Sequence, residues 1–179
     1  MAFKNAKIYG KFYSPERVLS YNRPWIFVLG SRSIGKSTAI GMYMIKRFLT
    51  DGSKFIYVRR TEDETLNTCR TFFDNSVRIL QSNGYNIKEF KYDRRNYYIK
   101  LDGEEEFTQC GTIIPLSQEY KYKSANYEDY NTILYDEFIS RDPNKYLGSK
   151  NSLDYEYDCC LSLYQTVDRG VGQSFQNKT

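Results

Sequence analysis

The chain has 179 residues, which is enough for one α/β core but short for two domains. An apolar fraction of 40% and 18 tyrosines favour a folded globular domain over a disordered chain. The formal net charge of +4 permits contact with nucleic acid without establishing it. The sequence contains no histidine, which excludes Ser-His and Cys-His nucleophile systems and most catalytic zinc sites.

The cysteines and the apolar runs bear on the cellular compartment. The cysteines lack metal-ligand spacing, and we expect them to be reduced and partly buried. No apolar run approaches the roughly 20 residues that cross a bilayer, and residues 1–13 lack the apolar segment of a signal peptide. We therefore expect a soluble, intracellular protein without membrane contact. The four cysteines are Cys69, Cys110, Cys159 and Cys160.

The N-terminal third predicts a short helix, a buried strand and an amphipathic helix. Residues 13–21 are typical of a turn and a short helix. Residues 25–29, Trp-Ile-Phe-Val-Leu, form a continuous apolar run that we interpret as a central strand buried on both faces. After a glycine-rich stretch, apolar residues recur every four positions and predict a helix that Gly52 ends. These apolar residues are Ile40, Met44 and Phe48.

A second strand and a second helix follow. Residues 55–58, Phe-Ile-Tyr-Val, predict another buried strand, and Arg59 and Arg60 come directly after it. Like the other small basic clusters of the chain, we interpret these two arginines as solvated surface charge. An apolar stripe at helical spacing then predicts a helix that ends near Asn83-Gly84. Its members are Leu66, Cys69, Phe73, Val77 and Leu80.

The remaining residues complete an α/β pattern. Residues 87–114 alternate in polarity between turn signals, which predicts an antiparallel hairpin or small meander inserted into a parallel sheet. Residues 132–135 predict the next core strand, and residues about 152–167 a last helix. Strands alternating with helices predict an α/β fold with a mainly parallel sheet flanked by helices. The last helix is expected to bury Leu153, Tyr157, Cys160, Leu161 and Tyr164.

Residues 30–37, Gly-Ser-Arg-Ser-Ile-Gly-Lys-Ser, satisfy the phosphate-binding pattern G-x-x-x-x-G-K-[ST] in full. The glycines let the backbone curl so that its N–H groups point at phosphate oxygens, and the following helix directs its positive end there. Lys36 would reach the β and γ oxygens of ATP, and the Ser37 hydroxyl would ligate Mg²⁺. The predicted nucleotide-binding residues are Gly30, Ser31, Arg32, Ser33, Ile34, Gly35, Lys36, Ser37 and Thr38.

An acidic pair, Asp136-Glu137, ends the strand predicted at residues 132–135. In P-loop folds that strand lies beside the first one, so its carboxylates face the phosphate site. Asp136 would hold Mg²⁺ together with Ser37, and Glu137 would orient and deprotonate the attacking water. A glutamate in this place favours hydrolysis over phosphoryl transfer to a metabolite. The N-K-x-D motif of GTP-specific proteins is absent, because Asn144-Lys145 is followed by Tyr and Leu.

Charge compensation during phosphoryl transfer often needs an arginine. Arg32 lies inside the phosphate-binding motif and is one candidate. Arg169 follows the last predicted helix, where a subunit surface could present it to the nucleotide of a neighbour. From the residues alone, Arg169 is more typical of surface charge.

Four segments, in this order, resemble the DNA-encapsidation ATPases of small tailed phages with protein-capped linear genomes, whose ring motor sits on a packaging RNA. Together they span nearly the whole chain. A fainter match, Thr-Val-Asp-Arg at residues 166–169, falls at the trans-acting arginine of that family. The four segments are residues 13–21, 30–37 with Arg32 in third place, 55–60, and 123–126 with 132–139.

The resemblance implies a P-loop NTPase of the additional-strand, catalytic-glutamate type, related to terminase large subunits, that hydrolyses ATP with Mg²⁺. It implies a homo-oligomeric ring, a pentamer, at the portal (connector) vertex of a procapsid in the cytoplasm of the infected bacterial host. Double-stranded DNA would thread through the ring, and packaging RNA would be a further partner. Carried over residue by residue, Arg169 becomes the arginine finger that acts on the adjacent subunit, and Lys123 a second trans-acting basic residue.

The C-terminal end departs from the family pattern. Family members continue with a further core strand and a separate nuclease-like domain, whereas this sequence ends at Thr179. We therefore expect residues 1–179 to be a single ATPase domain. Two other functions remain open: a non-motor P-loop ATPase that regulates DNA replication or partition, and a small-molecule kinase. For a kinase lid, residues 87–110 supply only two arginines.

Overall fold

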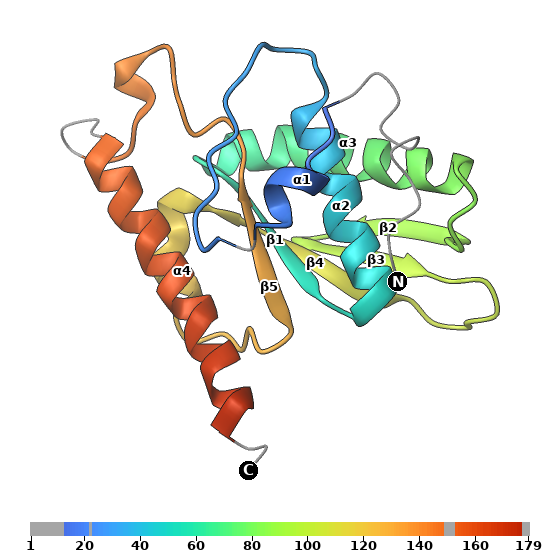
Figure 1. The fold of residues 1–179 in the computed structure, drawn as a ribbon. Helices are drawn as coiled ribbons and strands as arrows, with labels where there is room; N and C mark the ends of the chain where they lie inside the picture. Colours follow the sequence, from blue (N-terminus) through green and yellow to red (C-terminus); the bar gives the residue numbers. More distant parts are fainter. Residues whose placement is uncertain (1–12, 22, 149–152, 177–179) are drawn as a thin grey trace.

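The computed structural model describes residues 13–21, 23–148 and 153–176 (Figure 1), and the side chains of Pro143 and residues 169–176 fall outside this description. The helices are α1 (Glu16–Leu19), α2 (Lys36–Asp51), α3 (Glu62–Ser82) and α4 (Leu153–Gln176), with short 3₁₀ helices η1 (Leu116–Tyr122) and η2 (Pro143–Lys145). The strands are β1 (Lys54–Arg59), β2 (Glu89–Asp93), β3 (Asn96–Lys100), β4 (Thr108–Pro115) and β5 (Tyr130–Tyr135).

One sheet with the strand order β2-β3-β4-β1-β5 forms the centre of the fold. β1 pairs in parallel with both β4 and β5, whereas β2 with β3 and β3 with β4 pair antiparallel. The α/β class and the inserted hairpin are therefore confirmed. Two of the four strand pairings are parallel and two are antiparallel, so the predicted parallel core is present and the inserted meander, which β4 joins, makes the whole sheet mixed.

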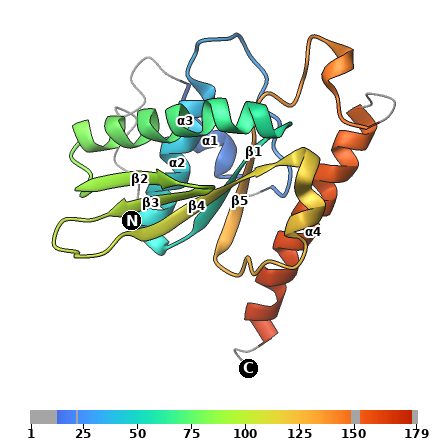
Figure 2. The ribbon, with the colours of Figure 1, turned by 180° about the vertical axis from the view of Figure 1, so that it is seen from behind.

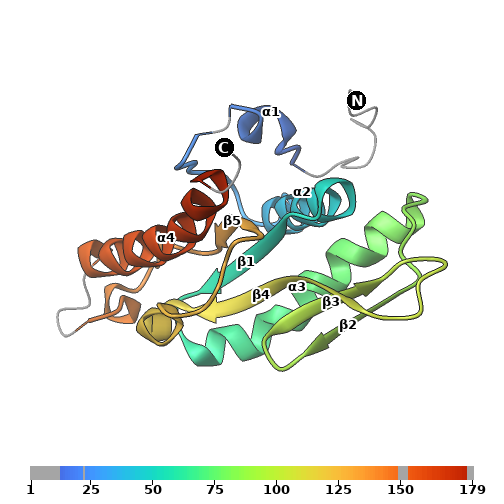
Figure 3. The same ribbon diagram turned by 90° about the horizontal axis from the view of Figure 1, so that it is seen from below.

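Helices cover both faces of this sheet (Figures 1 and 3). α2 and α3 pack together on one face, and α4 packs with η1 on the other, as Figure 2 shows from behind. Successive residues of β1 alternate between the two cores, since side chains in a strand point to opposite faces. Phe55 and Tyr57 face α2 and α3, whereas Ile56 and Val58 face α4. β1 is thus buried on both sides, as the apolar run predicted.

Local sequence signals set the ends of α2 and α3. α2 begins after Gly35 and ends at Gly52, and both glycines adopt left-handed backbone angles, with φ of 74° and 76°. Such angles are accessible to glycine at little cost. Thr61 directly precedes α3, and its hydroxyl accepts a hydrogen bond from the Glu64 N–H, as an N-cap threonine does. The ends of α2 agree with the sequence prediction.

The strand predicted at residues 25–29 is wrong. The segment runs beside α4 and β5 without joining the sheet, and β5 is the last strand on this side among the described residues. Phe27 and Leu29 are 62% and 70% exposed, so the apolar run is not buried on both faces. Its contacts are aromatic: the ring of Trp25 lies 5.3 Å from that of Tyr164, and Phe27 lies 5.6 Å from Phe138. These contacts hold the segment against α4 and the residues that follow β5, without strand pairing.

The last predicted helix exists but buries a different face. α4 extends from Leu153 to Gln176, well beyond the predicted end. Leu153 and Tyr157 are 47% and 50% exposed, so their predicted burial is wrong. Tyr157 can remain at the surface because a tyrosine ring is amphipathic. Which face of α4 is buried depends on the elements that its side chains pack against. The buried stripe comprises Glu156, Cys159, Leu163, Thr166 and Val167.

The cysteines are free, as predicted: three are buried and Cys160 is partly buried. Across the described ranges, every helix is too short or too polar to cross a bilayer.

Candidate active site

The loop from Gly30 to Gly35 leads directly into α2 and has an unusual backbone. Ser33 and Gly35 both have positive φ, at 64° and 74°. Positive φ is uncommon for a non-glycine residue, and loops that mix right- and left-handed residues form concave arrays of N–H groups that attract anions. The N-terminal end of α2 adds its partial positive charge at Lys36. The loop geometry therefore suits a bound phosphate group.

The Lys36 side chain lies over this loop. Its ammonium group donates to the carbonyl oxygens of Gly30, at 3.0 Å, and Ser31, at 2.7 Å. The positive charge is thereby held beside the concave backbone rather than extended into solvent.

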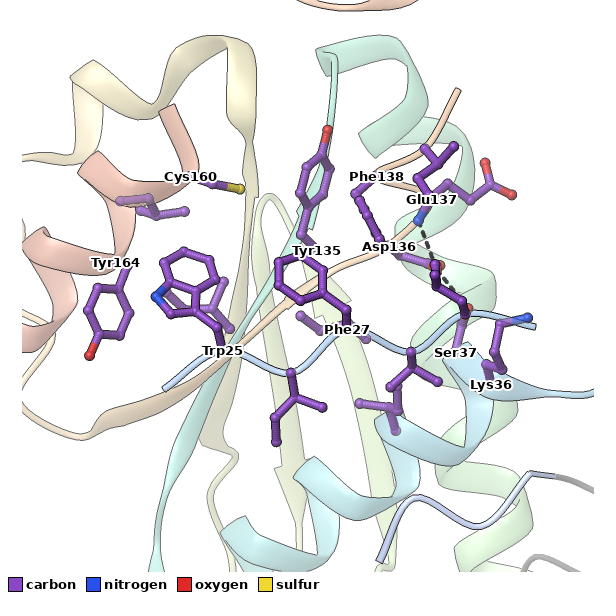
Figure 4. Close-up of a pocket in the computed structure, with 18 of the residues that line it drawn as sticks. Trp25, Phe27, Lys36, Ser37, Tyr135, Asp136, Glu137, Phe138, Cys160 and Tyr164 are labelled. Carbon is purple, nitrogen blue, oxygen red and sulfur yellow. Dashed lines mark hydrogen bonds between the residues drawn. The ribbon is translucent and has the colours of Figure 1, made fainter. Parts of the chain in front are cut away.

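Asp136, directly after β5, is fixed by three donors from different elements. The Ser37 hydroxyl of α2 donates to its Oδ1 at 2.8 Å, and the Glu137 N–H donates to the same oxygen at 3.1 Å (Figure 4). Tyr57 of β1 donates to Oδ2 at 3.2 Å. Burial raises the pKa of Tyr57, and the Asp136 charge raises it further, so the phenol stays protonated and remains a donor. The structure thus brings Ser37 and Asp136 together at the start of α2.

Glu137 has the second strained backbone position of the site, with φ of 55°. Its side chain is 61% exposed and accepts a hydrogen bond from Nη2 of Arg59 at 3.0 Å. The Arg59 Nη1 atom also lies 3.6 Å from Asp136. Arg59 is itself only 7% exposed, and within the described residues its Nε has no hydrogen-bond partner. A buried cation therefore balances the two adjacent carboxylates.

The site is chemically suited to Mg²⁺. Ser37 and Asp136 provide hard oxygen donors in direct contact, which is the donor type that Mg²⁺ prefers. No group of three or more histidine, cysteine, aspartate or glutamate side chains that could hold a metal occurs in the described part of the chain. An ion at Ser37 and Asp136 would thus complete its shell with water and phosphate oxygens, as Mg²⁺ commonly does.

A cleft of about 1230 Å³ extends from this site along β5. Figure 4 shows its two ends: Lys36, Ser37 and the acidic pair at one, and Trp25 with Tyr164 of α4 at the other. The cleft follows the unpaired segment 25–29 throughout. It is polar at the loop end and aromatic at the α4 end.

Of the three other predicted basic residues, the structure describes the side chains of Arg32 and Lys123. Arg32 is exposed on the loop and lines the cleft. Lys123 lies at the end of η1, 48% exposed, and its ammonium group is 3.7 Å from Glu119. Glu119 in turn accepts a hydrogen bond from Ser162, so Lys123 belongs to the α4 side of the fold. Arg169 lies in α4, but its side chain falls outside the described residues.

Sequence reasoning missed Arg59 and Arg60 as parts of the site. Their interpretation as solvated surface is wrong, because they are only 6% and 3% exposed. The sequence signal that could have identified the two arginines is their position at the carboxyl end of β1. The carboxyl ends of neighbouring parallel strands meet at one edge, so charges after β1 face the acidic pair after β5.

Comparison with known proteins identifies the family to which the chain belongs. The family described as Podovirus DNA encapsidation protein (Gp16) matches residues 9–174. The chain belongs to this family. Its relatives include the DNA packaging proteins of Bacillus phage phi29, 37% identical over 158 residues, and Bacillus phage B103, 38% identical over 153 residues. These alignments cover 88% and 85% of this chain but 42% of each relative, so the chain spans less than half their length.

Solved structures of encapsidation proteins share the fold. The crystal structure of the N-terminal domain of the DNA packaging ATPase from bacteriophage phi29 matches with a TM-score of 0.69 at 35% identity, over 87% of this chain and 72% of that one. The phi29 viral genome packaging motor assembly gives a TM-score of 0.65 at 35% identity, over 88% and 43%. The five-stranded sheet and its helices are therefore the fold of an encapsidation-family ATPase domain.

Proposed function

We propose that this chain is the ATPase domain of a phage packaging motor, which hydrolyses ATP to move double-stranded DNA into a procapsid. The observation that carries the proposal is the 2.8 Å contact between Ser37 and Asp136. It joins the phosphate-binding motif to the acidic pair in one site, in a chain that belongs to the DNA encapsidation family. This contact supports the proposal because it brings the phosphate-binding motif and the acidic pair within hydrogen-bond distance of each other.

Each residue of the site has a distinct role in the proposed reaction. Lys36 moves from the loop carbonyls to the β and γ oxygens of ATP, which the backbone of residues 31–37 surrounds, with Thr38 completing the site. Ser37 and Asp136 would hold Mg²⁺, which would supply charge neutralisation for the phosphates. Glu137, whose carboxylate is mostly exposed, leaves Arg59 and accepts a proton from the attacking water.

The partners follow from the same proposal. The protein acts in a homo-oligomeric ring, a pentamer, in which Arg169 and Lys123 of one subunit act on the nucleotide of the next. The ring works in the cytoplasm of the infected host, transiently at the portal vertex and together with packaging RNA. The match to a phi29 motor assembly supports this context.

The test is the steady-state ATPase rate against protein concentration, with and without double-stranded DNA. The wild-type rate should rise more than linearly with concentration and increase with DNA. Arg169→Ala should abolish the non-linear part, whereas Arg70→Ala, at an exposed arginine in the middle of α3, should behave as wild type.

Two results would contradict this function. A linear rate that neither DNA nor Arg169→Ala changes would leave a non-motor ATPase. Transfer of the γ-phosphate to an added metabolite would favour a kinase instead.

A further inference from the structure

Arg60, one residue beyond β1, is buried in a polar cluster outside the residues assigned to the reaction. It is 3% exposed, and its Nε donates to both carboxylate oxygens of Glu156, at 2.7 and 3.0 Å. Its Nη2 donates to two backbone carbonyl oxygens, those of Phe138 at 3.1 Å and Glu137 at 3.3 Å. One guanidinium group therefore joins α4 to the backbone of the predicted catalytic glutamate.

The anchor of Arg60 is itself fixed. Glu156 is only 1% exposed and also accepts a hydrogen bond from the Tyr135 hydroxyl of β5. Burial raises the pKa of Tyr135, and the neighbouring Glu156 raises it further, so this phenol remains a donor. The Tyr146 ring packs 5.2 Å from the guanidinium carbon of Arg60. The orientation of Arg60 is thus set by β5, α4 and the segment that follows β5.

The backbone that Arg60 holds is strained. Glu137 has φ of 55°, in the left-handed region that glutamate rarely adopts. Such a conformation persists only where surrounding contacts determine it. Rotation at this position would redirect the Glu137 side chain. The two carbonyl groups bound by Arg60 belong to the consecutive peptide groups on either side of the Phe138 Cα atom, so Arg60 restrains the backbone directly after Glu137.

We propose that Arg60, fixed by Glu156, is a positioning residue that holds residues 137–138 in the conformation that aims the Glu137 carboxylate at the attacking water. The inference rests on the proposed ATPase function, in which Glu137 is the general base. A consequence is that Arg60 connects α4, the helix that contains Arg169, to the backbone of residues 137–138. A shift of α4 therefore changes the orientation of the Glu137 carboxylate.

The first test compares Arg60→Lys with Arg47→Lys. A lysine at position 60 keeps the charge but lacks the fork that reaches a carboxylate and two carbonyl groups. The control makes the same change at an arginine that pairs with Asp51 on the surface of α2. We expect kcat to fall about 100-fold in Arg60→Lys, as for a displaced catalytic group, with the Kd for ATP unchanged. Arg47→Lys should alter neither.

A second variant separates positioning from stability. Removing Glu156 alone would leave a buried, uncompensated charge and could unfold the protein. The double substitution Arg60→Met with Glu156→Leu replaces the buried pair by apolar groups of similar length, a change that proteins often tolerate. We expect this variant to fold and bind ATP but to hydrolyse it as slowly as Arg60→Lys. A folded double variant with the wild-type kcat would overturn the proposal.

Two measurements together distinguish failure of this inference from failure of the proposed function: ATP hydrolysis by wild type, and hydrogen exchange of the amides of residues 136–139. If wild type binds ATP without hydrolysing it, the ATPase proposal fails and takes the positioning role with it. If wild type hydrolyses ATP, Arg60→Lys should exchange faster in this segment while losing kcat. Unchanged exchange, or losses of kcat and ATP affinity in equal proportion, would overturn the inference while leaving the ATPase function intact.

Discussion

Glu137→Gln tests the proposed general base most directly. The substitution keeps the size of the side chain and removes its ability to accept a proton, which should lower kcat by about 10²- to 10⁴-fold. ATP affinity should not change, because in the proposed site Lys36 and the backbone of residues 31–37, not Glu137, hold the phosphates. Stability should change little. The Glu137 carboxylate is 61% exposed, so its ion pair with Arg59 contributes less than about 1 kcal/mol.

The assay combines phosphate release with calorimetric titration of ATP and Mg²⁺, and thermal unfolding controls for structure. A loss of 1 kcal/mol lowers the Tm of a domain this size by about 2–4 °C, so a larger fall would mean that the mutation disturbs more than the base. Glu105→Gln, at an exposed glutamate of the β3–β4 turn, is the matched control. Equal losses of kcat and ATP affinity in Glu137→Gln, or an unchanged kcat, would refute the assigned role.

Three further perturbations test the site and the fold. Lys36→Ala should weaken ATP binding about 10- to 100-fold in calorimetry, because it removes a charge-assisted contact, and unchanged affinity would count against the phosphate site. Gly111→Ala should cost about 1–3 kcal/mol in urea unfolding, since its Cβ would lie 2.7 Å from the Phe55 ring, and Phe55→Leu should restore part of the loss. Burial raises the pKa of both Tyr127 and Tyr130 to about 12. The folded state therefore retains these protons. The contribution of the two tyrosines to the free energy of unfolding should be constant below pH about 10 and should fall between pH 10 and 12, which urea unfolding across this pH range measures.

The parts of the site that the sequence predicts are those encoded by contiguous residues. The 30–37 motif contains both its glycines and its lysine, and the α2 helix after it follows from apolar spacing alone. The acidic pair is recognisable because it ends an apolar strand. The prediction that these segments meet relied on a strand at residues 25–29 beside the one at 132–135. In the structure residues 25–29 lie outside the sheet, and the hydrogen bond from Ser37 to Asp136 joins the two segments instead.

The incorrect predictions concern burial that depends on distant partners. The apolar run at 25–29 has the composition of a central strand, but composition does not provide the neighbouring strand that would cover it. Within the described residues, α4 packs against one side of Trp25, which stays 37% exposed, and Phe27 and Leu29 are exposed further. On α4, Glu156 is buried where a periodicity argument places a polar surface residue. Its burial is possible because Arg60, almost one hundred positions earlier, supplies the compensating charge.

The two adjacent arginines at the end of β1, Arg59 and Arg60, contact Glu137 in different ways. Successive residues of a strand point to opposite faces, so two adjacent arginines at its end diverge. Arg59 binds the carboxylate of Glu137, whereas Arg60 binds the backbone of the same residue and the buried Glu156 of α4. In the proposed reaction the first contact breaks and the second persists. Lysine substitutions at the two positions should therefore have different effects. In Arg60→Lys the Glu137 carboxylate is no longer directed at the attacking water, whereas in Arg59→Lys it loses only a competing partner.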